Sequence, residues 1–337
     1  MIPIFIAIVL SFVIVILFMP GAIRMLKEKG NVGIDVHKPD KPEIAKGGGF
    51  IFLFAIVTSL LVVIGAMTFL SEGTINPGLL AALVSILMAG MIGLLDDNLD
   101  FKNRTKISLP IIASIPMVAM QVGTTTMSIP LIGTLDLGVL YPLIVIPLMM
   151  TFIIDSTNMY GGQNGLEAGL ASINASVIIL FVILTSLFSG VAMTPGQQDS
   201  AIVAGALFGA MIAFLVFNRY PAKILPGDVG RLPIGAAIAA ALILGNMDRL
   251  AVVLYIPFMI NFILYLLYRV HVKRTGMEWA KFASPREDGT LEVVGPYTMY
   301  WILPWLSNKI TEKRNVLLLV ILQAIIAYSG LILFLVL

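Results

Sequence analysis

Long apolar runs without a charged residue, separated by short polar segments, dominate the hydrophobic pattern of this chain. A helix needs about 20 apolar residues to cross the hydrocarbon core of a bilayer, and most of the runs reach that length. They predict about ten membrane-spanning helices, at residues 2–23, 47–71, 73–95, 107–135, 137–154, 168–198, 200–218, 232–247, 250–268 and 315–337. Two runs exceed one span, and we expect their polar ends, Gly123–Asp136 and Ser189–Asp199, to be loops.

The basic residues lie on alternate inter-helix segments. With the N-terminus outside the cell, 20 of the 21 Lys and Arg residues fall on the cytoplasmic side, and only Arg249 falls on the other. Cytoplasmic loops of membrane proteins carry such an excess, so we expect both termini to be extracytoplasmic. No basic segment precedes the first run, so we expect a retained helix and not a cleaved signal peptide. The predicted cytoplasmic loops are residues 24–46, 96–106, 155–167, 218–231 and 269–314.

The composition agrees with a membrane protein. Of the 337 residues, 59% are hydrophobic and 12% are charged, about half the charged fraction of a soluble domain. We therefore exclude a soluble enzyme and a nucleic-acid-binding protein, and expect one all-α polytopic domain, residues 1–337, in the cell membrane. The absence of cysteine excludes disulfides and thiolate nucleophiles. The two histidines, His37 and His271, lack the spacing of a zinc motif.

The dense polar clusters all fall in the predicted cytoplasmic loops. Asp96, Asp97 and Asp100 directly follow the third span. Three carboxylates within five residues repel one another, and a divalent cation would offset that repulsion. Mg²⁺ is typically held by one or two carboxylates together with substrate phosphates. The structural alternative is a solvated acidic turn balanced by the basic residues after it, among them Lys106.

A second cluster, Asp155–Gly169, joins the fifth and sixth predicted spans. It is rich in amides and glycine, and irregular backbone at this depth is tolerated only where it is buried in protein or lines a cavity. Asn158 and Asn164 offer donors and acceptors of the kind that a nucleobase or a sugar amide requires. The alternative is an ordinary turn, but fifteen residues of this polarity exceed what a turn needs.

A third cluster, residues 218–231, contains Lys223, Asp228 and Arg231. Asp228 follows a glycine, and we expect it to open the next helix. There it is either a helix cap or a metal-binding carboxylate beside two phosphate-neutralising cations.

The fourth cluster, Asp35–Gly49, combines lysines with a run of three glycines before the second span. Glycine costs a helix about 0.8–1.0 kcal/mol per position relative to alanine. We therefore expect another group to approach this backbone closely. The lysines are either phosphate contacts or ordinary positive charges at the membrane surface.

Together these motifs resemble a known family. Pro42-Glu43 with Gly47-Gly48, Asp96–Asp100, Asn158–Gly169 and Pro221–Asp228 are similar in order and spacing to motifs of the polyprenyl-phosphate N-acetylhexosamine-1-phosphate transferases. The string Asn164-Gly165-Leu166-Glu167-Ala168-Gly169 resembles the dolichyl-phosphate N-acetylglucosamine phosphotransferases of eukaryotes and archaea most closely. The resemblance covers most of the chain. It implies ten helices, a cytoplasmic active site, and transfer of a sugar-1-phosphate from a UDP-sugar to a polyprenyl phosphate with release of UMP, which initiates lipid-linked glycan synthesis.

The resemblance also implies roles for single residues. Asp228 and Asn158 would hold Mg²⁺, or Mn²⁺ in its place, against the pyrophosphate. Asp96 and Asp97 would act on the lipid phosphate, and Asp96 is the better candidate for a base. Substrate contacts would come from Glu43, Lys46, Asp100, Lys106, Asn164, Lys223 and Arg286. Among these, Lys106 would contact the β-phosphate and Asn164 the uridine, while Arg286 would replace a basic motif of the family that the last cytoplasmic loop lacks.

Other classes stay open. A UbiA-like prenyltransferase should show two aspartate-rich motifs, and this chain has one; the string typical of a CDP-alcohol phosphotransferase is absent. A transporter or lipid flippase would place ionisable groups in the middle of its spans. The expected partners are a UDP-sugar, with UDP-GlcNAc first, a polyprenyl or dolichyl phosphate, and membrane lipid, but no nucleic acid. A homodimer, the exact sugar and the polyprenol length are left open.

Overall fold

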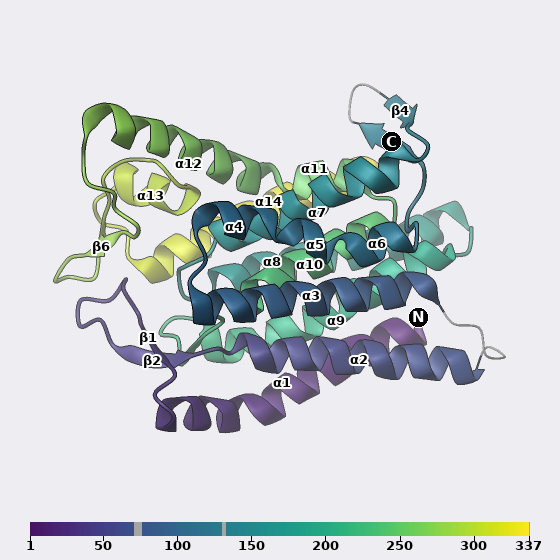
Figure 1. Cartoon of the computed structure of the whole chain (residues 1–337), viewed down its shortest axis with the longest axis horizontal. Helices are drawn as coiled ribbons and strands as arrows, with labels where there is room; N and C mark the ends of the chain where they lie inside the picture. Colours follow the sequence, from purple (N-terminus) through teal and green to yellow (C-terminus); the bar gives the residue numbers. More distant parts are fainter. Residues whose placement is uncertain (71–75, 130–132, 337) are drawn as a thin grey trace.

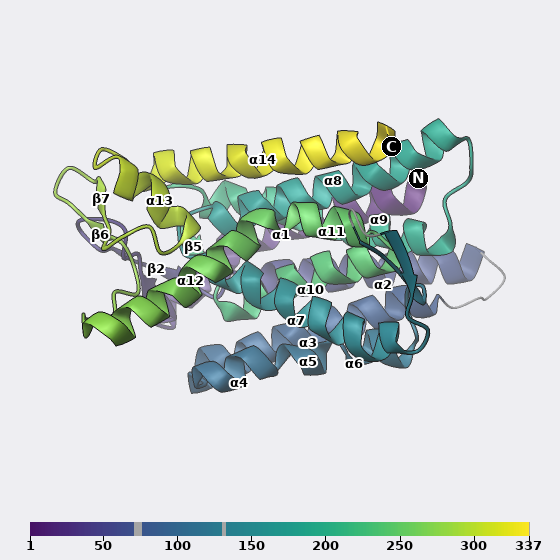
Figure 2. The same cartoon turned by 90° about the horizontal axis from the view of Figure 1, so that it is seen from above.

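Helices that run roughly along one axis make up most of the molecule (Figure 1, Figure 2). This computed structural model describes residues 1–70, 76–129 and 133–336. The α-helices are α1 (Ile2–Glu28), α2 (Gly49–Leu70), α3 (Pro77–Leu99), α4 (Asn103–Ser108), α5 (Pro110–Ala113), α6 (Ile115–Ala119), α7 (Ile146–Met159), α8 (Leu166–Ser189), α9 (Pro195–Asn218), α10 (Asp228–Leu244), α11 (Asp248–Leu254), α12 (Ile256–Thr275), α13 (Met299–Leu306) and α14 (Glu312–Val336). The π-helical turn η1 (Tyr141–Val145) leads into α7. The strands are β1 (Val32–Ile34), β2 (Glu43–Lys46), β3 (Thr126–Ile129), β4 (Gly133–Asp136), β5 (Ile224–Leu225), β6 (Ser284–Pro285) and β7 (Leu291–Glu292).

The helices confirm a polytopic membrane protein, while the number ten stays a prediction. Within the described ranges, seven helical segments are long and apolar enough to cross a bilayer, or eight if α11 and α12 form one bent span. The predicted run 107–135 begins as the short helices α4–α6, which restart near Pro110 and Pro116. Proline interrupts a helix because it has no N–H to donate. The run 232–247 falls in α10 as far as Leu244, and α10 has 17 residues.

The predicted span 250–268 is bent and not straight. Helices α11 and α12 meet at Tyr255 and enclose a bend of 56°. Pro257 lies in the first turn of α12 and cannot donate a backbone hydrogen bond to the last turn of α11. Helix α12 consequently leans away from the bundle axis (Figure 1).

Two segments predicted as loops contain regular structure. In the segment Gly123–Asp136, β3 and β4 pair as an antiparallel hairpin, so the all-α prediction is right about the helices and wrong in leaving out strands. In the segment Ser189–Asp199, α9 already begins at Pro195. Thr194 and Gln197 form a capping box, which satisfies two backbone N–H groups and starts the helix there.

A small three-stranded sheet in the order β1-β2-β5 lies at one end of the bundle. The glycine run follows β2, and the close approach expected there is confirmed. The N–H of Gly49 donates to the carbonyl of Pro226 at 2.9 Å, and a Cβ on Gly49 would overlap the backbone of Gly230. The group that needs this space is the protein's own helix α10, so the glycines join α2 to α10.

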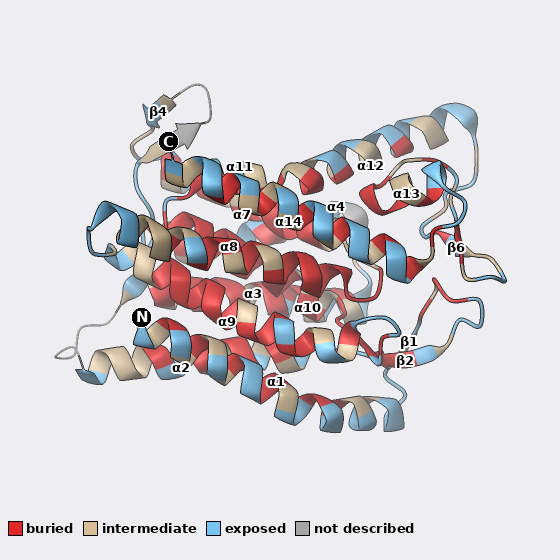
Figure 3. Cartoon of the chain, turned by 180° about the vertical axis from the view of Figure 1, so that it is seen from behind, coloured by how far each residue is buried: buried red, intermediate tan, exposed pale blue. Residues whose placement is uncertain are grey.

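Helix α10 forms the centre of the molecule. From Val229 to Leu244 every residue except Arg231 is buried, and the helix packs against α3, α7 and α9. Burial decreases towards α1 and α14, whose outer faces expose apolar side chains (Figure 3). Both chain termini lie at the end of the bundle opposite the sheet (Figure 1). An even number of membrane passages is therefore expected.

Candidate active site

Three aspartates from two helices meet at the sheet end of the bundle. Asp96 and Asp97 lie in the last turn of α3, and Asp228 is the first residue of α10, as expected from the sequence. Burial raises the pKa of Asp228 above its usual range, Arg231 opposes this shift, and a hydrogen bond with Asp96 and the charges of Asp97 and Asp96 add to it. The three carboxylates therefore share one electrostatic environment.

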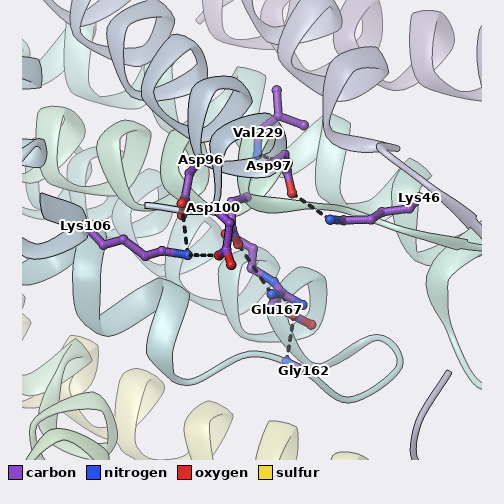
Figure 4. A network of polar contacts seen from close by, with 10 residues as sticks. Lys46, Asp96, Asp97, Asp100, Lys106, Gly162, Glu167 and Val229 are labelled. Atoms are coloured by element: carbon purple, nitrogen blue, oxygen red, sulfur yellow. Dashed lines mark hydrogen bonds and ion pairs between the residues drawn. The ribbon is translucent and has the colours of Figure 1, made fainter. Parts of the chain in front are cut away.

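Each of the adjacent aspartates has its own lysine (Figure 4). The Nζ of Lys106 lies 2.9 Å from Oδ1 of Asp96, and the Nζ of Lys46 lies 2.9 Å from Oδ1 of Asp97. Asp97 also accepts a hydrogen bond of 2.9 Å from the backbone N–H of Val229, in the first turn of α10. Neighbouring side chains on a helix point about 100° apart, which explains why the two carboxylates have different partners. The site thus joins α3, β2, α4 and α10.

The carboxylates of the acidic cluster differ in exposure, and Lys106 pairs with two of them as the alternative of a balanced acidic turn expects. The side chain of Asp100 is 99% exposed, although Lys106 lies 3.3 Å from it, so Asp100 fits a solvated turn. The side chain of Asp96 is 3% exposed, which does not fit that interpretation. Burial opposes the charge of Lys106, but hydrogen bonds with Asp96 and Asp100 and the charges of Asp96 and Asp228 raise its pKa above the usual value. The ammonium group therefore stays charged beside the aspartates.

Glu167 is a further functional candidate, beyond the residues for which the sequence predicts a role. Its Oε1 lies 2.9 Å from Nε of Arg231 and accepts a hydrogen bond of 2.8 Å from the N–H of Gly162. A nitrogen of the same guanidinium lies 3.6 Å from Oδ1 of Asp228. Glu167 and Arg231 thereby connect the glycine-rich loop to the aspartates. Glu167 is part of the motif shared with the resembled family, and this was the signal that could have identified it.

The segment around Asn158 and Asn164 is more helical than expected. The predicted loop 155–167 is helical as far as Met159, so Asn158 lies in the last turn of α7, and only residues 160–165 connect α7 to α8. Asn164 is buried, and its Oδ1 accepts a hydrogen bond of 2.8 Å from the N–H of Ala222. Its backbone N–H donates to Oε1 of Glu312 at 2.7 Å. Asn164 therefore joins three segments of the chain.

A buried charged group lies next to Asn164. The Nζ of Lys38 contacts Oδ2 of Asp35 at 2.6 Å and Oε2 of Glu312 at 2.7 Å. Asp35, His37 and Glu312 bring potential metal-ligand atoms within 4.8 Å of one another, which no local spacing could reveal because Glu312 opens the last helix. The lysine ammonium, however, already contacts both carboxylates and occupies the space between them. We therefore describe this group as an ion-pair network and not as a metal centre.

The remaining predicted substrate residues lie at the same end of the molecule. Glu43 and Lys223 are exposed, in β2 and directly before β5. Arg286 lies in the β6–β7 segment, where its guanidinium donates to the carbonyl of Asn308 at 3.1 Å and lies 3.5 Å from Glu292. Its contacts therefore belong to its own loop, and the substrate roles of these three residues stay predictions.

The donor set at the aspartates suits a hard divalent cation. Asp228 and Asp96 supply carboxylate oxygens, and Mg²⁺ prefers oxygen ligands. Asn158, in the last turn of α7, stays a predicted amide ligand. The raised pKa of Asp228 reflects burial and neighbouring negative charge, both of which a bound cation would offset. The two adjacent lysines and Arg231 can neutralise phosphate groups. The arrangement can hold an anionic substrate and a metal ion together.

Comparison with known proteins agrees with this chemistry. A family model described as glycosyl transferase family 4 matches residues 79–246. The chain is 34% identical, over 84% of its length and 82% of the relative's, to a Saccharolobus solfataricus protein named provisionally as a UDP-N-acetylglucosamine–dolichyl-phosphate N-acetylglucosaminephosphotransferase. It is 31% identical, over 80% of its length and 83% of the relative's, to the phospho-N-acetylmuramoyl-pentapeptide-transferase of Shouchella clausii.

Proposed function

This chain belongs to glycosyl transferase family 4, and on that premise we propose that it transfers N-acetylhexosamine-1-phosphate from a UDP-sugar to a polyprenyl phosphate. An oxygen of the lipid phosphate attacks the phosphorus that carries the sugar. The bond from this phosphorus to the bridging oxygen breaks, and UMP leaves. The products are a lipid-linked diphosphate sugar and UMP, so every atom of the two substrates is accounted for.

The observation that carries the proposal is the meeting of three aspartates, two lysines and one arginine at one end of an apolar helical bundle. Reaction between a phosphate and a diphosphate brings several negative charges together, and catalysis depends on fixed positive groups that stabilise them. The apolar outer faces of the helices allow a lipid acceptor to reach the same end from the membrane. The names of the relatives favour N-acetylglucosamine and dolichyl phosphate within this class.

We assign Mg²⁺, with Mn²⁺ as the alternative, to Asp228 and Asn158. When bound, such an ion supplies a Lewis acid that polarises phosphoryl oxygens. Lys46 and Lys106 stand beside the aspartates and neutralise substrate phosphates. Asp96 orients the acceptor phosphate and holds its proton at a carboxylate oxygen. Asn164 and the loop around it bind the nucleotide.

The site is proposed to face the cytoplasm. It lies at the end of the bundle that carries the predicted cytoplasmic loops, opposite both termini (Figure 1). A nucleotide sugar from the cytoplasm and a lipid phosphate in the inner leaflet would then meet at one surface.

The test uses purified protein with UDP-sugars labelled in the sugar and a short polyprenyl phosphate. We expect lipid-linked label and UMP in equal amounts with UDP-GlcNAc, and neither product when Mg²⁺ and Mn²⁺ are chelated. Release of inorganic diphosphate from a prenyl diphosphate substrate, without UMP, would instead identify a prenyltransferase. Movement of free sugar or lipid across vesicles without any UMP would identify a transporter.

A further inference from the structure

Lys38 joins four separate segments of the chain at one buried ammonium group. It lies in the loop between β1 and β2, and the residue is 6% exposed. Its Nζ lies 2.6 Å from Oδ2 of Asp35, 2.7 Å from Oε2 of Glu312, and 2.6 Å from Oδ1 of Asn164. The ring of Tyr220, from the loop after α9, lies 4.6 Å from the same nitrogen. The ammonium group is therefore enclosed by two carboxylates, an amide oxygen and an aromatic ring.

This burial is not expected of a lysine that serves only as a surface charge. Transfer of an ammonium group out of water is costly unless it is paired and hydrogen-bonded, and a lysine also loses side-chain entropy when it is fixed. A metal ion is a less fitting occupant, because both carboxylates already contact the ammonium at 2.7 Å or less. The lysine is the cation of this group.

The group is connected to the aspartates through the loop of residues 160–165. Asn164 holds one end of this loop, through its side chain to Lys38 and its backbone N–H to Glu312. Two residues earlier in the loop, the N–H of Gly162 donates to Glu167, which pairs with Arg231. Arg231 in turn approaches Asp228 at 3.6 Å. The position of this loop therefore depends on Lys38, through Asn164, and on the candidate active site, through Gly162.

We propose that Lys38 is a positioning residue for the sugar nucleotide. By binding both Asn164 and Glu312, Lys38 holds the loop of residues 160–165 against the last helix. The inference rests on the proposed function, since it takes a UDP-sugar to be the substrate. A binding loop that is already held in place does not have to be ordered when the ligand arrives, so the affinity is higher. Lys38 itself is buried and acts on the substrate only through Asn164 and the loop.

Replacement of Lys38 by methionine removes the ammonium group and keeps most of the side-chain volume. Asp35 and Glu312 then repel each other, and Asn164 loses a charged partner. We expect Lys38→Met to raise the KM for UDP-GlcNAc by about tenfold or more, as loss of a hydrogen bond to a charged group does, with the KM for polyprenyl phosphate unchanged. The affinity for UDP, measured by calorimetry without acceptor, should fall by a similar factor.

Lys41→Met is the matched control. It changes the same residue type in the same loop, but the side chain of Lys41 is exposed. We expect its kinetic constants to equal those of the wild type. Glu312→Gln is the second variant, for use if Lys38→Met does not fold. It keeps an acceptor for the N–H of Asn164 but weakens the hold on Lys38, so the KM for UDP-GlcNAc and the Kd for UDP should again rise.

Three outcomes would overturn the inference for a folded variant: an unchanged KM for UDP-GlcNAc, equal rises in the KM of both substrates, or a lower kcat alone. The last result is what a smaller folded fraction gives, because inactive molecules lower the rate without changing KM. Failure of the wild type to transfer sugar-1-phosphate from any UDP-sugar would overturn the proposed function instead.

Discussion

At the scale of single residues, the three carboxylates of the candidate site differ in the partners that each already has. Asp96 and Asp97 each have a lysine at 2.9 Å and a backbone N–H donor. Asp228 has no lysine partner among the described residues; it has a longer contact, 3.6 Å, to the guanidinium of Arg231 and a hydrogen bond with Asp96. A carboxylate with fewer committed oxygens is more available to an added cation. Asp228 is therefore the strongest candidate for the metal ligand.

We predict that Asp228→Asn lowers kcat by at least about a hundredfold, the size of loss seen when one electrostatic catalytic group is removed. The change preserves the size of the side chain, and Asp228 is not inside the packed core, so the protein should stay folded. Turnover and size-exclusion behaviour in detergent measure these two properties. Asp40→Asn, in an exposed loop position, is the control. Near-normal turnover with unchanged Mg²⁺ dependence would contradict the assignment.

A second residue-scale prediction concerns His37, whose two ring nitrogens are buried without a hydrogen-bond partner. Burial lowers its pKa to about 4, the charge of Asp35 opposes this shift, and the charge of Lys38 adds to it. Between pH 6.5 and pH 4 the unfolded chain therefore binds a proton that the folded chain does not. Folding stability should fall as the pH drops through this window and level off below it.

The contribution of His37 amounts to about 2 kcal/mol at pH 5. His37→Leu should remove this part of the pH dependence, so the variant should lose less stability than the wild type between pH 7.5 and pH 5. Unfolding in detergent at the two pH values provides the measurement. His271→Leu controls for the loss of a histidine elsewhere. Equal losses in the wild type and His37→Leu would show that His37 is not buried in its neutral form.

At the scale of elements, glycines set how closely the helices of the site approach. Gly93 of α3 faces the first residues of α10, and a Cβ there would lie 2.7 Å from the backbone nitrogen of Val229 and overlap the carbonyl of Asp228. Gly49 of α2 meets Gly230 of α10 in the same way. These contacts are between backbones, which cannot move aside as a flexible side chain can. Because Gly93 has no side chain, the backbones of α3 and α10 can approach this closely, and this approach sets the distance between their aspartates.

Gly93→Ala should therefore separate the end of α3 from the start of α10. We expect a lower melting temperature, by the several degrees that overpacking of 1–3 kcal/mol causes, and a larger loss of turnover than of stability. Gly65→Ala is the control, because nothing lies within 4 Å of its added Cβ. Alanine at that position should favour the helix. Wild-type turnover in Gly93→Ala would show that the spacing of α3 and α10 is not critical.

At the scale of the whole molecule, the polar loops and the two termini lie at opposite ends (Figure 1). The small sheet, the aspartates and the Lys38 group all belong to the first end. The core around α10 connects this end to the rest of the bundle, since nearly the entire helix is buried. One end of the bundle carries the candidate site, and the other carries the β3–β4 hairpin and the turns between helices.

The predicted orientation can be measured because the chain has no cysteine. A single cysteine at Lys102 should be protected from a membrane-impermeant thiol reagent in intact cells and should react after lysis. A single cysteine at Val191, an exposed residue after α8, should react in intact cells. The cysteine-free parent is the control for background labelling. The opposite pattern would place the candidate site outside the cell.

Several features follow from the sequence alone. Apolar runs of span length determine a polytopic membrane protein. A continuous apolar segment of this length can pair all its backbone N–H and C=O groups inside a bilayer by forming a helix. The family resemblance, confirmed by the relatives, came from short motifs with local order and spacing. The position of Asp228 at a helix start was also predictable, because a glycine and an aspartate before an apolar run mark a helix boundary. Such signals act within a few residues of one another.

Only the tertiary structure decided which distant groups meet. Lys46 pairs with Asp97, and Lys38 pairs with Glu312 across 274 residues, but no local pattern specifies an ion pair between separate loops. The strands β1, β2 and β5 have two to four residues each, so they are too short to show a periodic pattern. They form because neighbouring helices bring their backbones together. The spacing of the aspartates is set by glycine contacts between helices, and these contacts exist only in the packed bundle.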